Sequence, residues 1–553
     1  MANFFVDLWT TFTPKQRVNI AIYILGIMAY KFALEYYNGS FITQANERFG
    51  DKRYQKIAIL TGTNYAAQAV GSIIVAPLVK RFPTRSVLAI AVLTFAVISA
   101  IPLIADSATG GVLKFNTPDN KTKYGTWNPN GLFPIYIISG FSYGTVELIR
   151  RILPRDVVGG DVTRLRRMDA LTHVLYEVAG TTGAFTSTSL IGKFGYNYSA
   201  FLSPILFSLA GLVWFCISPD GEATDRKEAK SRLSEVERQA ETESLGASLW
   251  TAIRSFGKAF YYGAYLILSD RRFIWLLPGY TLALYGHRYL ENGLAPIYAK
   301  SVIGTSSYSQ IIVGGSNFGE LLGALSVLIF SRVIPTPMPF LRLDALFLNL
   351  VWVMPFFPYT RGAVSSAWRL AAVFIPISFG WAAGDVSLAA YIQSTLARME
   401  SKDKDVSALG ACMSTLYVTY IVLYSVISTL LGRWVDSRLK GLKGAATVEP
   451  ARDALKYVGG VHFTILSVII IASTFIPKGS FSFNPKVIDE SLLKISDEET
   501  VSGESRGADD YDDDLKKHAE EKGLHFDPKQ DDISKDGVGI LAQNPAAVAA
   551  KPN

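Results

Sequence analysis

Gly71–Pro83, which reads GSIIVAPLVKRFP, and Gly323–Pro335, which reads GALSVLIFSRVIP, are two versions of one pattern. In each stretch a glycine opens an apolar run, a basic residue stands near its end, and Pro-Thr closes it. An Asn-aromatic pair precedes both stretches, as Asn64-Tyr65 and Asn317-Phe318. The shared order of these features indicates that the second half of the chain repeats the first.

Two further matches follow in the same order. Gly144–Leu148 (GTVEL) is echoed at Gly384–Leu388 (GDVSL), and Ser189–Phe194 (SLIGKF) is echoed at Thr429–Trp434 (TLLGRW). Each match is short, but the spacing between first and second copies stays nearly constant along the chain. This predicts a duplicated membrane bundle, and two related halves are how many transporters are built.

The composition is that of a membrane protein with polar ends. Of 553 residues, 49% are hydrophobic and only 18% are charged, which is below the roughly 25% of soluble domains. Twelve apolar segments come near the roughly 20 residues that a helix needs to cross a bilayer. They cover residues 18–39, 57–79, 87–105, 132–153, 169–192, 198–217, 272–296, 309–331, 342–358, 366–396, 406–431 and 457–476.

The predicted fold is therefore an all-α integral membrane protein with twelve transmembrane helices in two six-helix bundles. We expect an N-terminal bundle over residues 1–217, a cytoplasmic linker over 218–271 and a C-terminal bundle over 272–476. Residues 477–553 carry 10 Lys/Arg and 17 Asp/Glu, and this acidic tail is expected to be disordered because it cannot bury a core.

Basic residues predict the orientation. Most of those between predicted spans lie on the side of the N-terminus, so both termini are expected in the cytoplasm, with the plasma or vacuolar membrane as location. They are Lys80, Arg81, Arg85, Arg155, Arg164, Arg166, Arg167, Arg226, Lys227, Lys230, Arg232 and Arg238. The sequon Asn120-Lys-Thr122 falls in the longest outer loop, which makes Asn120 the predicted glycosylation site.

Several function classes lack their sequence signatures. We find no phosphate-binding loop, nucleophile elbow or catalytic metal triad, so an enzyme and an ATP-driven pump are disfavoured. The five histidines have no metal-ligand spacing, and no cofactor or metal is expected. The positive charge is divided among short loops, which argues against nucleic-acid binding. The expected partners are a small solute or ion, protons and the lipid bilayer, and the expected state is a monomer.

The stretch Ala76–Leu88 (APLVKRFPTRSVL) resembles the cytoplasmic motif of the major facilitator superfamily, whose usual form is Gly-x-Leu-x-Asp-Arg-x-Gly-Arg-Arg. Arg81 and Arg85 match basic positions of this gate motif, whereas Lys80 stands where the acid belongs and Pro83 where glycine belongs. With the six-plus-six repeat, the resemblance covers roughly residues 15–476. The resemblance is to the eukaryotic, fungal-like type of this superfamily. The marks of the sugar, peptide and drug subfamilies are missing, so no subfamily is assigned.

Ionisable side chains stand inside the predicted spans, where each costs about 2.5–3.5 kcal/mol and needs a partner or an aqueous cavity. The resemblance implies that helices one, four, seven and ten line that cavity. The candidates for proton coupling are Glu35, Glu147, Glu177, Glu291, Glu320 and Asp385. The candidates for substrate binding are Lys31, Asn64, Gln68, His287, Arg288 and Asn317.

Proton coupling is predicted because a carboxyl that is buried away from water favours its neutral form and can exchange a proton near neutral pH. A structural reading stays open, in which Lys31–Glu35 and Arg288–Glu291 are neutral pairs that fix helix packing. The leading hypothesis is a secondary active transporter that moves a small polar or charged solute by alternating access. The alternatives are a metal or organic-cation transporter of the same fold and a sensor that does not transport.

Overall fold

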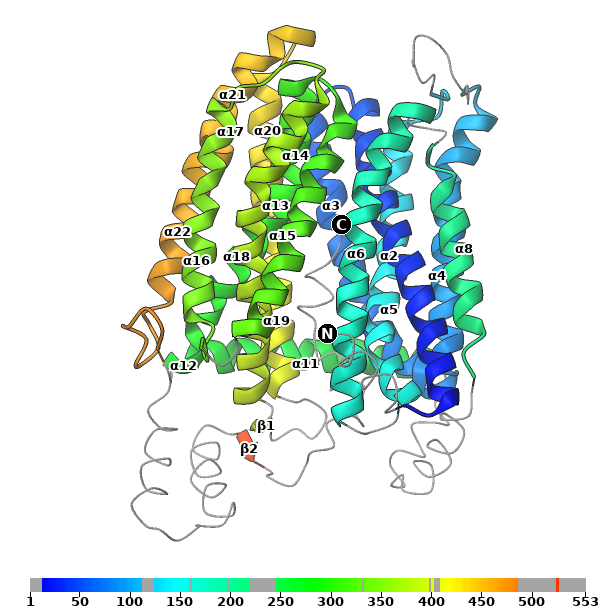
Figure 1. Cartoon of the computed structure of the whole chain (residues 1–553), viewed down its shortest axis with the longest axis vertical. Coiled ribbons are helices and arrows are strands. Elements are labelled where there is room, and N and C mark those ends of the chain that lie inside the picture. Colours follow the sequence, from blue (N-terminus) through cyan, green and yellow to red (C-terminus); the bar gives the residue numbers. More distant parts are fainter. Residues whose placement is uncertain are drawn as a thin grey trace.

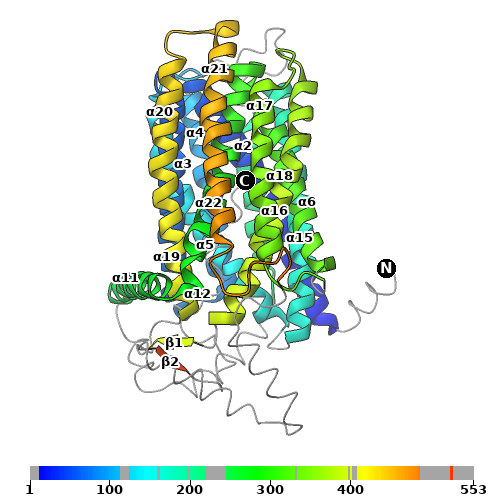
Figure 2. The ribbon, with the colours of Figure 1, turned by 90° about the vertical axis from the view of Figure 1, so that its left-hand side faces the viewer.

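The computed structural model describes residues 12–111, 124–158, 162–195, 199–218, 245–330, 333–396, 399–401, 408–485 and 524–526. Within these ranges the chain is almost entirely helical, and most helices run side by side along one axis (Figures 1 and 2). Eight helical segments of the described chain are long and apolar enough to cross a membrane. The predicted all-α membrane fold is confirmed.

The first half contributes six membrane-crossing helical segments. They are α2 (Pro14–Arg48), α3 (Arg53–Arg81), α4 (Thr84–Ala108), α5 (Leu132–Val158), α6 (Val162–Phe194) and α8 (Leu202–Phe215), with a short turn η1 (Pro129–Gly131) before α5. Helix α2 extends well beyond the predicted span 18–39. Thr13 and Gln16 form a reciprocal capping box at its start, and polar residues such as Gln44 and Asn46 are buried in its last turns. Hydropathy alone ends a span at such residues, but their tertiary contacts continue the helix.

The second half contributes six further helical segments, several of them divided by π or 3₁₀ turns. The seventh consists of α12 (Arg271–Ile274), η2 (Leu277–Leu282), α13 (Ala283–Tyr289), η3 (Leu290–Leu294), α14 (Ala295–Ile297) and η4 (Tyr298–Ile303). After η5 (Ser306–Tyr308) come α15 (Ser309–Phe330), then α16 (Met338–Leu348), η6 (Asn349–Trp352) and α17 (Val353–Phe356), and α18 (Val364–Leu396). The last two are α19 (Ala408–Leu423), η7 (Tyr424–Ser428) and α20 (Thr429–Arg438), followed by η8 (Gly444–Thr447), α21 (Val448–Leu455), η9 (Lys456–Val461) and α22 (His462–Ser473).

Helix α11 (Leu245–Ser269) and a pair of short strands lie outside these twelve segments. Helix α11 crosses the lower end of the molecule in Figure 1, and a small antiparallel pair joins β1 (Met399–Ser401) to β2 (Leu524–Phe526) at the same end. We call this end the α11 end and the opposite one the α21 end. The predicted tail begins with ordered turns, because the guanidinium of Arg342 donates to the carbonyl oxygens of Ser480 and Ser482.

The repeated sequence builds repeated contacts. Helix α3 packs closely on α5, and α15 packs in the same way on α18. Gly71 allows the first approach, since a Cβ there would lie 2.2 Å from the backbone oxygen of Phe141. Gly323 allows the second, with the corresponding distance to Phe379 at 2.3 Å. The two glycines that open the matching sequence stretches therefore have the same packing role in the two halves.

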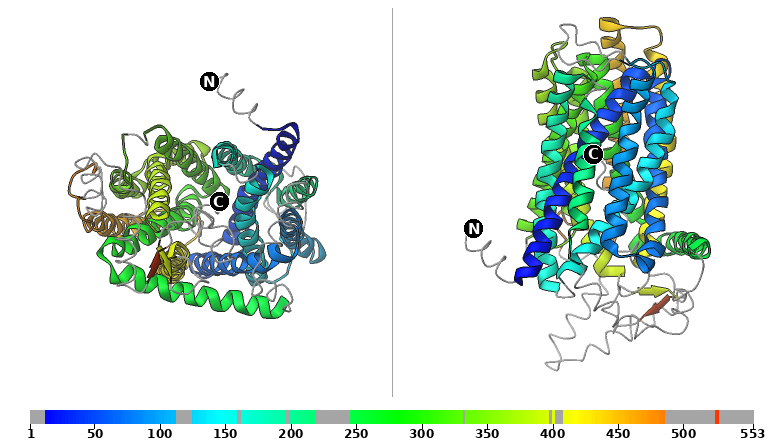
Figure 3. Two further views of the ribbon diagram at one scale, coloured as in Figure 1. Left: turned by 90° about the horizontal axis from the view of Figure 1, so that it is seen from below. Right: turned by 90° about the vertical axis from the view of Figure 1, so that its right-hand side faces the viewer.

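The two halves meet along two flanks, where α6 packs against α15, and α3 packs against α20 and η7. Figure 3 shows the halves as two groups of helices when the molecule is viewed along its long axis. Close approach of α3 and α20 depends on Gly432, where an added Cβ would lie 2.7 Å from the backbone of Tyr54. The interface between the halves is thus a helix-to-helix contact rather than a flexible linkage.

Polar contacts join the halves at the α21 end. The ammonium group of Lys300 pairs with the carboxylate of Glu47 at 2.5 Å, and Ser306 donates its hydroxyl to the same carboxylate at 2.5 Å. The hydroxyls of Tyr54 and Ser301 lie 2.6 Å apart. These bonds link α2 and α3 to the end of the seventh helical segment and hold the α21 end closed.

A helix cap across the interface adds to this closure. The backbone N–H groups of Tyr54 and Gln55, in the first turn of α3, donate to the two carboxylate oxygens of Asp436 at 3.1 and 2.9 Å. Asp436 belongs to α20 in the other half. A carboxylate at a helix N-terminus satisfies free N–H groups and opposes the positive end of the helix dipole, so α20 stabilises α3 only while the halves are together at this end.

Candidate functional site

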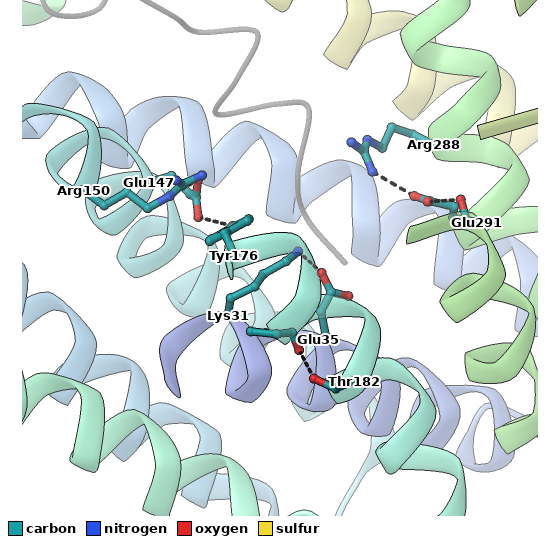
Figure 4. Close-up of polar contacts among 10 residues, drawn as sticks. Lys31, Glu35, Glu147, Arg150, Tyr176, Thr182, Arg288 and Glu291 are labelled. Carbon is teal, nitrogen blue, oxygen red and sulfur yellow. Dashed lines mark hydrogen bonds and ion pairs between the residues drawn. The ribbon is translucent and has the colours of Figure 1, made fainter. Parts of the chain in front are cut away.

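Two buried ion pairs face each other across the interface between the halves (Figure 4). Lys31 and Glu35 pair on α2, and Arg288 donates to Glu291 at 2.8 Å at the junction of α13 and η3. All four side chains are at most 2% exposed. The carboxylate of Glu35 interacts electrostatically with Arg288 and Glu291 across the interface.

The position of Lys31 is fixed by α6. Its ammonium group lies 4.8 Å from the centre of the Tyr176 ring, an arrangement that favours a cation over the face of an aromatic ring. Its aliphatic chain passes Gly180, where a Cβ would lie 2.5 Å from the lysine Cε. A glycine at this position therefore leaves room for a lysine to reach the centre of the protein.

Glu147 belongs to a second group on α5 and α6. It accepts from Arg150 at 2.7 Å and from the hydroxyl of Tyr176 at 2.9 Å, and Arg150 stacks 4.1 Å above the same ring. The ring of Tyr176 thus lies between this pair and Lys31. The structure brings Glu147 to a basic partner, Arg150, on its own helix.

Glu291 is also bound from outside its own helix. Ser316 of α15 donates to its Oε1 at 2.7 Å, and the hydroxyl of Ser378 on α18 lies 2.6 Å from that of Ser316. One residue further on, Asn292 donates to the hydroxyl of Tyr65 on α3 at 3.1 Å. The pair on the seventh segment is therefore connected both to its own half and to the opposite one.

Glu320 completes the central cluster, which we define as Lys31, Glu35, Arg288, Glu291 and Glu320. It lies on α15, is 6% exposed, and its Oε1 has no hydrogen-bond partner among the described residues. It interacts electrostatically with the other four members of the cluster. Among these five side chains there are two cations and three carboxylates, so one carboxylate is left over.

Asn317 lies one turn before Glu320 on α15. Its side-chain N–H₂ group is buried and has no hydrogen-bond partner in the part of the chain that the structure describes. Residues three apart on a helix share a face. One face of α15 thus carries a hydrogen-bond donor and an acceptor that no described residue satisfies.

Three predicted substrate-binding residues serve packing within one half. Asn64 donates to the Tyr136 carbonyl oxygen at 2.6 Å, and Gln68 donates to Asn64 at 2.6 Å, which ties α3 to α5. His287 points into its own half, the second. Its Nε2 lies 2.9 Å from Asp344, and its ring stacks on Trp381 at 5.1 Å between ring centres. The structure does not bring these three side chains into the central cluster.

The remaining predicted residues lie elsewhere. Glu177 is buried in α6, and Asp385 is half-buried in α18. In the gate motif, Arg81 donates to Ser248 of α11 at 2.7 Å and Arg85 donates to the Ile217 carbonyl oxygen, while Lys80 lies in α3 with a side chain outside the described atoms. Asn120 falls outside the described residues.

Sequence reasoning missed Asp344, which is fully buried and pairs with His287. The signal was present, because Asp344 stands inside the predicted span 342–358 and the cost of an ionisable side chain in a span applies to it equally. It also missed Tyr176, an ordinary packing residue by sequence, which contacts both Lys31 and Arg150.

A two-half helical membrane protein with paired charges at its centre has the architecture of a secondary transporter. The model of the Major Facilitator Superfamily matches residues 19–418, which is more than half of the chain. The protein belongs to the Major Facilitator Superfamily. The family and its transporter fold point to transport rather than to an enzyme activity.

Solved structures agree with this fold. The nucleoside transporter NupG matches with a TM-score of 0.52 and 12% identity over 83% of this chain and 99% of that one. A peptide transporter POT in complex with sulfate matches with a TM-score of 0.53 and 12% identity over 82% and 94%. The xylose transporter XylE from E. coli matches with a TM-score of 0.51 and 11% identity over 84% and 98%. No curated protein matches the chain in sequence.

Proposed function

We propose that the protein is a proton-coupled secondary transporter of a small polar or charged solute, which binds at the central cluster. The observation that carries this proposal is the left-over carboxylate of Glu320. It is buried, it lies beside two ion pairs, and its Oε1 has no hydrogen-bond partner among the described residues. One proton on this group would make the five side chains neutral, whereas its loss would leave a single negative charge away from bulk water.

Alternating access gives that proton a use. A carboxyl between two halves meets water from one side in one state and from the other side in the next, so its protonation can follow the two bulk solutions in turn. Glu320 lies on α15, Glu35 on α2 and Arg288 on α13. Rocking of the halves would therefore change the distance between the left-over carboxylate and Lys31, and with it the affinity of the carboxylate for a proton.

The solute class follows from the chain's own side chains. The neighbours of similar fold are named for a nucleoside, a peptide and xylose, which differ too much to select one. Charged and neutral donors are offered by the ammonium group of Lys31, the guanidinium of Arg288 and the amide of Asn317, whose N–H₂ group has no partner among the described residues. These groups suit a small molecule with anionic or zwitterionic character.

The proposed setting has both termini in the cytoplasm of a plasma or vacuolar membrane, glycosylation at Asn120, and a monomer as the working unit. Under this proposed orientation the α21 end would face outward, and the contacts between the halves at that end would close the site to the outside.

The test uses proteoliposomes loaded with a metabolite extract and analysed by mass spectrometry. The wild-type protein should accumulate at least one solute when a pH gradient is imposed. Glu320→Gln should lose accumulation but retain exchange of the same solute across a membrane without a gradient. The matched control is Glu449→Gln, which removes a carboxylate that is 78% exposed. Gradient-driven accumulation by Glu320→Gln at the wild-type rate would refute proton coupling at this residue.

A further inference from the structure

Helix α11 has an apolar face that is not covered by the described protein. Tyr261 is 70% exposed, Trp250 is 69% exposed, and Leu268 and Tyr265 are also exposed. These residues and Arg254 follow one another three, four or seven positions apart, which places them on one side of a helix. An unpartnered face with two tyrosines and a tryptophan is a surface that something else contacts.

The opposite face of α11 holds it to the bundle. Ala259, Leu266 and Ile267 are buried, and Thr415 of α19 donates to the Phe260 carbonyl oxygen at 2.7 Å. At Gly263 an added Cβ would lie 1.9 Å from the Ala411 backbone oxygen. Backbone approaches this close fix both the depth and the rotation of α11 against the start of α19.

The first turn of α11 reaches the other half. Ser248 accepts from Arg81 at the end of α3, so the 25 residues of α11 extend from the first half to the second. Figure 3 shows α11 running across both groups of helices, and Figures 1 and 2 show it perpendicular to them. A helix that is perpendicular to the membrane-crossing helices runs parallel to the membrane surface.

The burial and exposure of side chains along α19 indicate how deep α11 lies relative to the membrane. Thr415 is covered by α11, whereas Val422, Val426 and Leu430 further along the same segment are more than half exposed, as lipid-facing side chains are. Seven helical residues separate Thr415 from Val422, about 10 Å along the axis. Helix α11 therefore lies at the level of the headgroups, near enough for its long side chains to reach the lipid chains.

The side chains of α11 suit that layer. Tryptophan and tyrosine concentrate where hydrocarbon meets water. The sequence of α11 contains Arg254 and Lys258 and no acidic residue, and the next two residues are Asp270, which pairs with Arg272, and Arg271. Arg254 and Arg271 are exposed. Positive charge beside an aromatic face favours anionic lipid headgroups over a soluble protein.

We infer that α11 binds the membrane surface, with Trp250, Tyr261, Tyr265 and Leu268 among the lipid chains near the headgroups and Arg254 at the phosphate and carboxylate groups of anionic lipids. Because α11 contacts α3 in one half and α19 in the other, its attachment to the bilayer holds the two halves together along one flank. The inference concerns the membrane contact of the chain and holds whether or not the transported solute is correctly proposed.

The first experiment measures depth. A nitroxide label is placed at Tyr261→Cys in protein carrying Cys216→Ser and Cys412→Ala, reconstituted in nanodiscs of phosphatidylcholine and phosphatidylserine. Relaxation by oxygen and by a water-soluble nickel chelate is compared with labels at Val426→Cys, in the lipid-facing stripe, and Glu449→Cys, in water. The oxygen and nickel accessibilities of the label on α11 should be closer to those at Val426 than to those at Glu449. A second label at Tyr265→Cys should give the same result. Nickel accessibility equal to that at Glu449 overturns the inference. Low accessibility to both oxygen and nickel would mean that a soluble protein covers this face instead of lipid, and would overturn the inference too.

The second experiment measures lipid charge. Energy transfer from a dye at Tyr261→Cys to acceptor-labelled phosphatidylserine or phosphatidylcholine reports the preference of α11 for each lipid. The preference for phosphatidylserine should fall about fivefold in Arg254→Gln. It should be unchanged in the control Arg433→Gln, an exposed arginine on α20 near the α21 end. Equal transfer to both lipids in the wild-type protein, or loss of preference in the control alone, overturns the role of Arg254.

Discussion

The carboxylate of Glu47 and the ammonium group of Lys300 pair at 2.5 Å between the two halves of the molecule at the α21 end. Glu47 lies in the last turn of α2 and Lys300 in the last π turn of the seventh segment. Both helices also carry a central ion pair, at Lys31–Glu35 and Arg288–Glu291. A change in the distance between these helices therefore alters the closed end and the central cluster together.

Removal of the Glu47–Lys300 pair should favour opening of the α21 end. The two side chains are 20% and 24% exposed, and a partly exposed pair is worth about 0.2–1 kcal/mol. Lys300→Gln should therefore increase the labelling rate of Ser301→Cys by an impermeant thiol reagent by up to about fivefold. Lys456→Gln, which removes the partner of the exposed Asp453 at 3.3 Å, serves as control. An unchanged labelling rate in Lys300→Gln would show that the pair does not restrain the end.

The Asp436 cap should stabilise the closed state because it neutralises the start of a helix in the other half. Asp436→Asn removes the negative charge but keeps a hydrogen-bond acceptor, and should lose about 0.5–1 kcal/mol of that stability. Asp436→Ala should lose about 1–2 kcal/mol because the α3 N–H groups lose their acceptor as well. Distances between spin labels at the α21 end give the populations. Equal effects of the two substitutions would mean that the charge contributes nothing.

Gly432 should not tolerate a side chain. An added Cβ would lie 2.7 Å from the Tyr54 backbone, which cannot move aside as a flexible side chain can. Gly432→Leu should separate α20 from α3 and abolish the closed state, with loss of transport. Gly192→Leu is the matched control on α6, since no atom of the described residues lies within 4 Å of a Cβ there. Membrane insertion and spin-label distances should be normal for the control, and a closed Gly432→Leu protein would contradict the model of this interface.

The Lys31–Glu35 pair should depend on both members. Loss of one partner leaves a buried charge alone, at a cost of about 3–5 kcal/mol, whereas an apolar replacement of both can be nearly neutral. Lys31→Met should therefore lower the thermal stability of the purified protein strongly, and Lys31→Met/Glu35→Leu should recover most of it. Transport should be lost in both variants if the pair also binds solute or proton. A stable double variant that still transports would assign the pair a purely structural role.

Asp385 separates two interpretations of the buried carboxyl groups. The sequence predicts a proton carrier at this position, and the structure places it half-buried on α18. Asp385→Asn should abolish uptake driven by a pH gradient and leave membrane insertion intact. Measurement of uptake in proteoliposomes at equal protein density checks this, with Asp453→Asn at the exposed start of the last segment as control. Wild-type flux in Asp385→Asn would remove this residue from the coupling mechanism.

Much of the architecture was predictable from the sequence because crossing a bilayer imposes strong rules. Apolar length predicts spans, and the repeated glycine stretches at Gly71 and Gly323 predict matching halves. The central pairs were also visible, since Lys31 and Glu35 are four residues apart and Arg288 and Glu291 three apart, and such spacings share a helix face. Local periodicity was sufficient for these features.

The roles of single polar residues required the tertiary structure. His287 stands next to Arg288 in sequence, yet it faces Asp344 and Trp381 while Arg288 faces the centre. Asn64 and Gln68 bind within one half, and the partner that caps α3 comes from Asp436, hundreds of residues away. Sequence determined that these side chains must be satisfied, because an unpaired polar group inside a membrane bundle is costly. Only the packing of one helix against another decided which partner satisfies each, and that Glu320 has a carboxylate oxygen with no partner among the described residues.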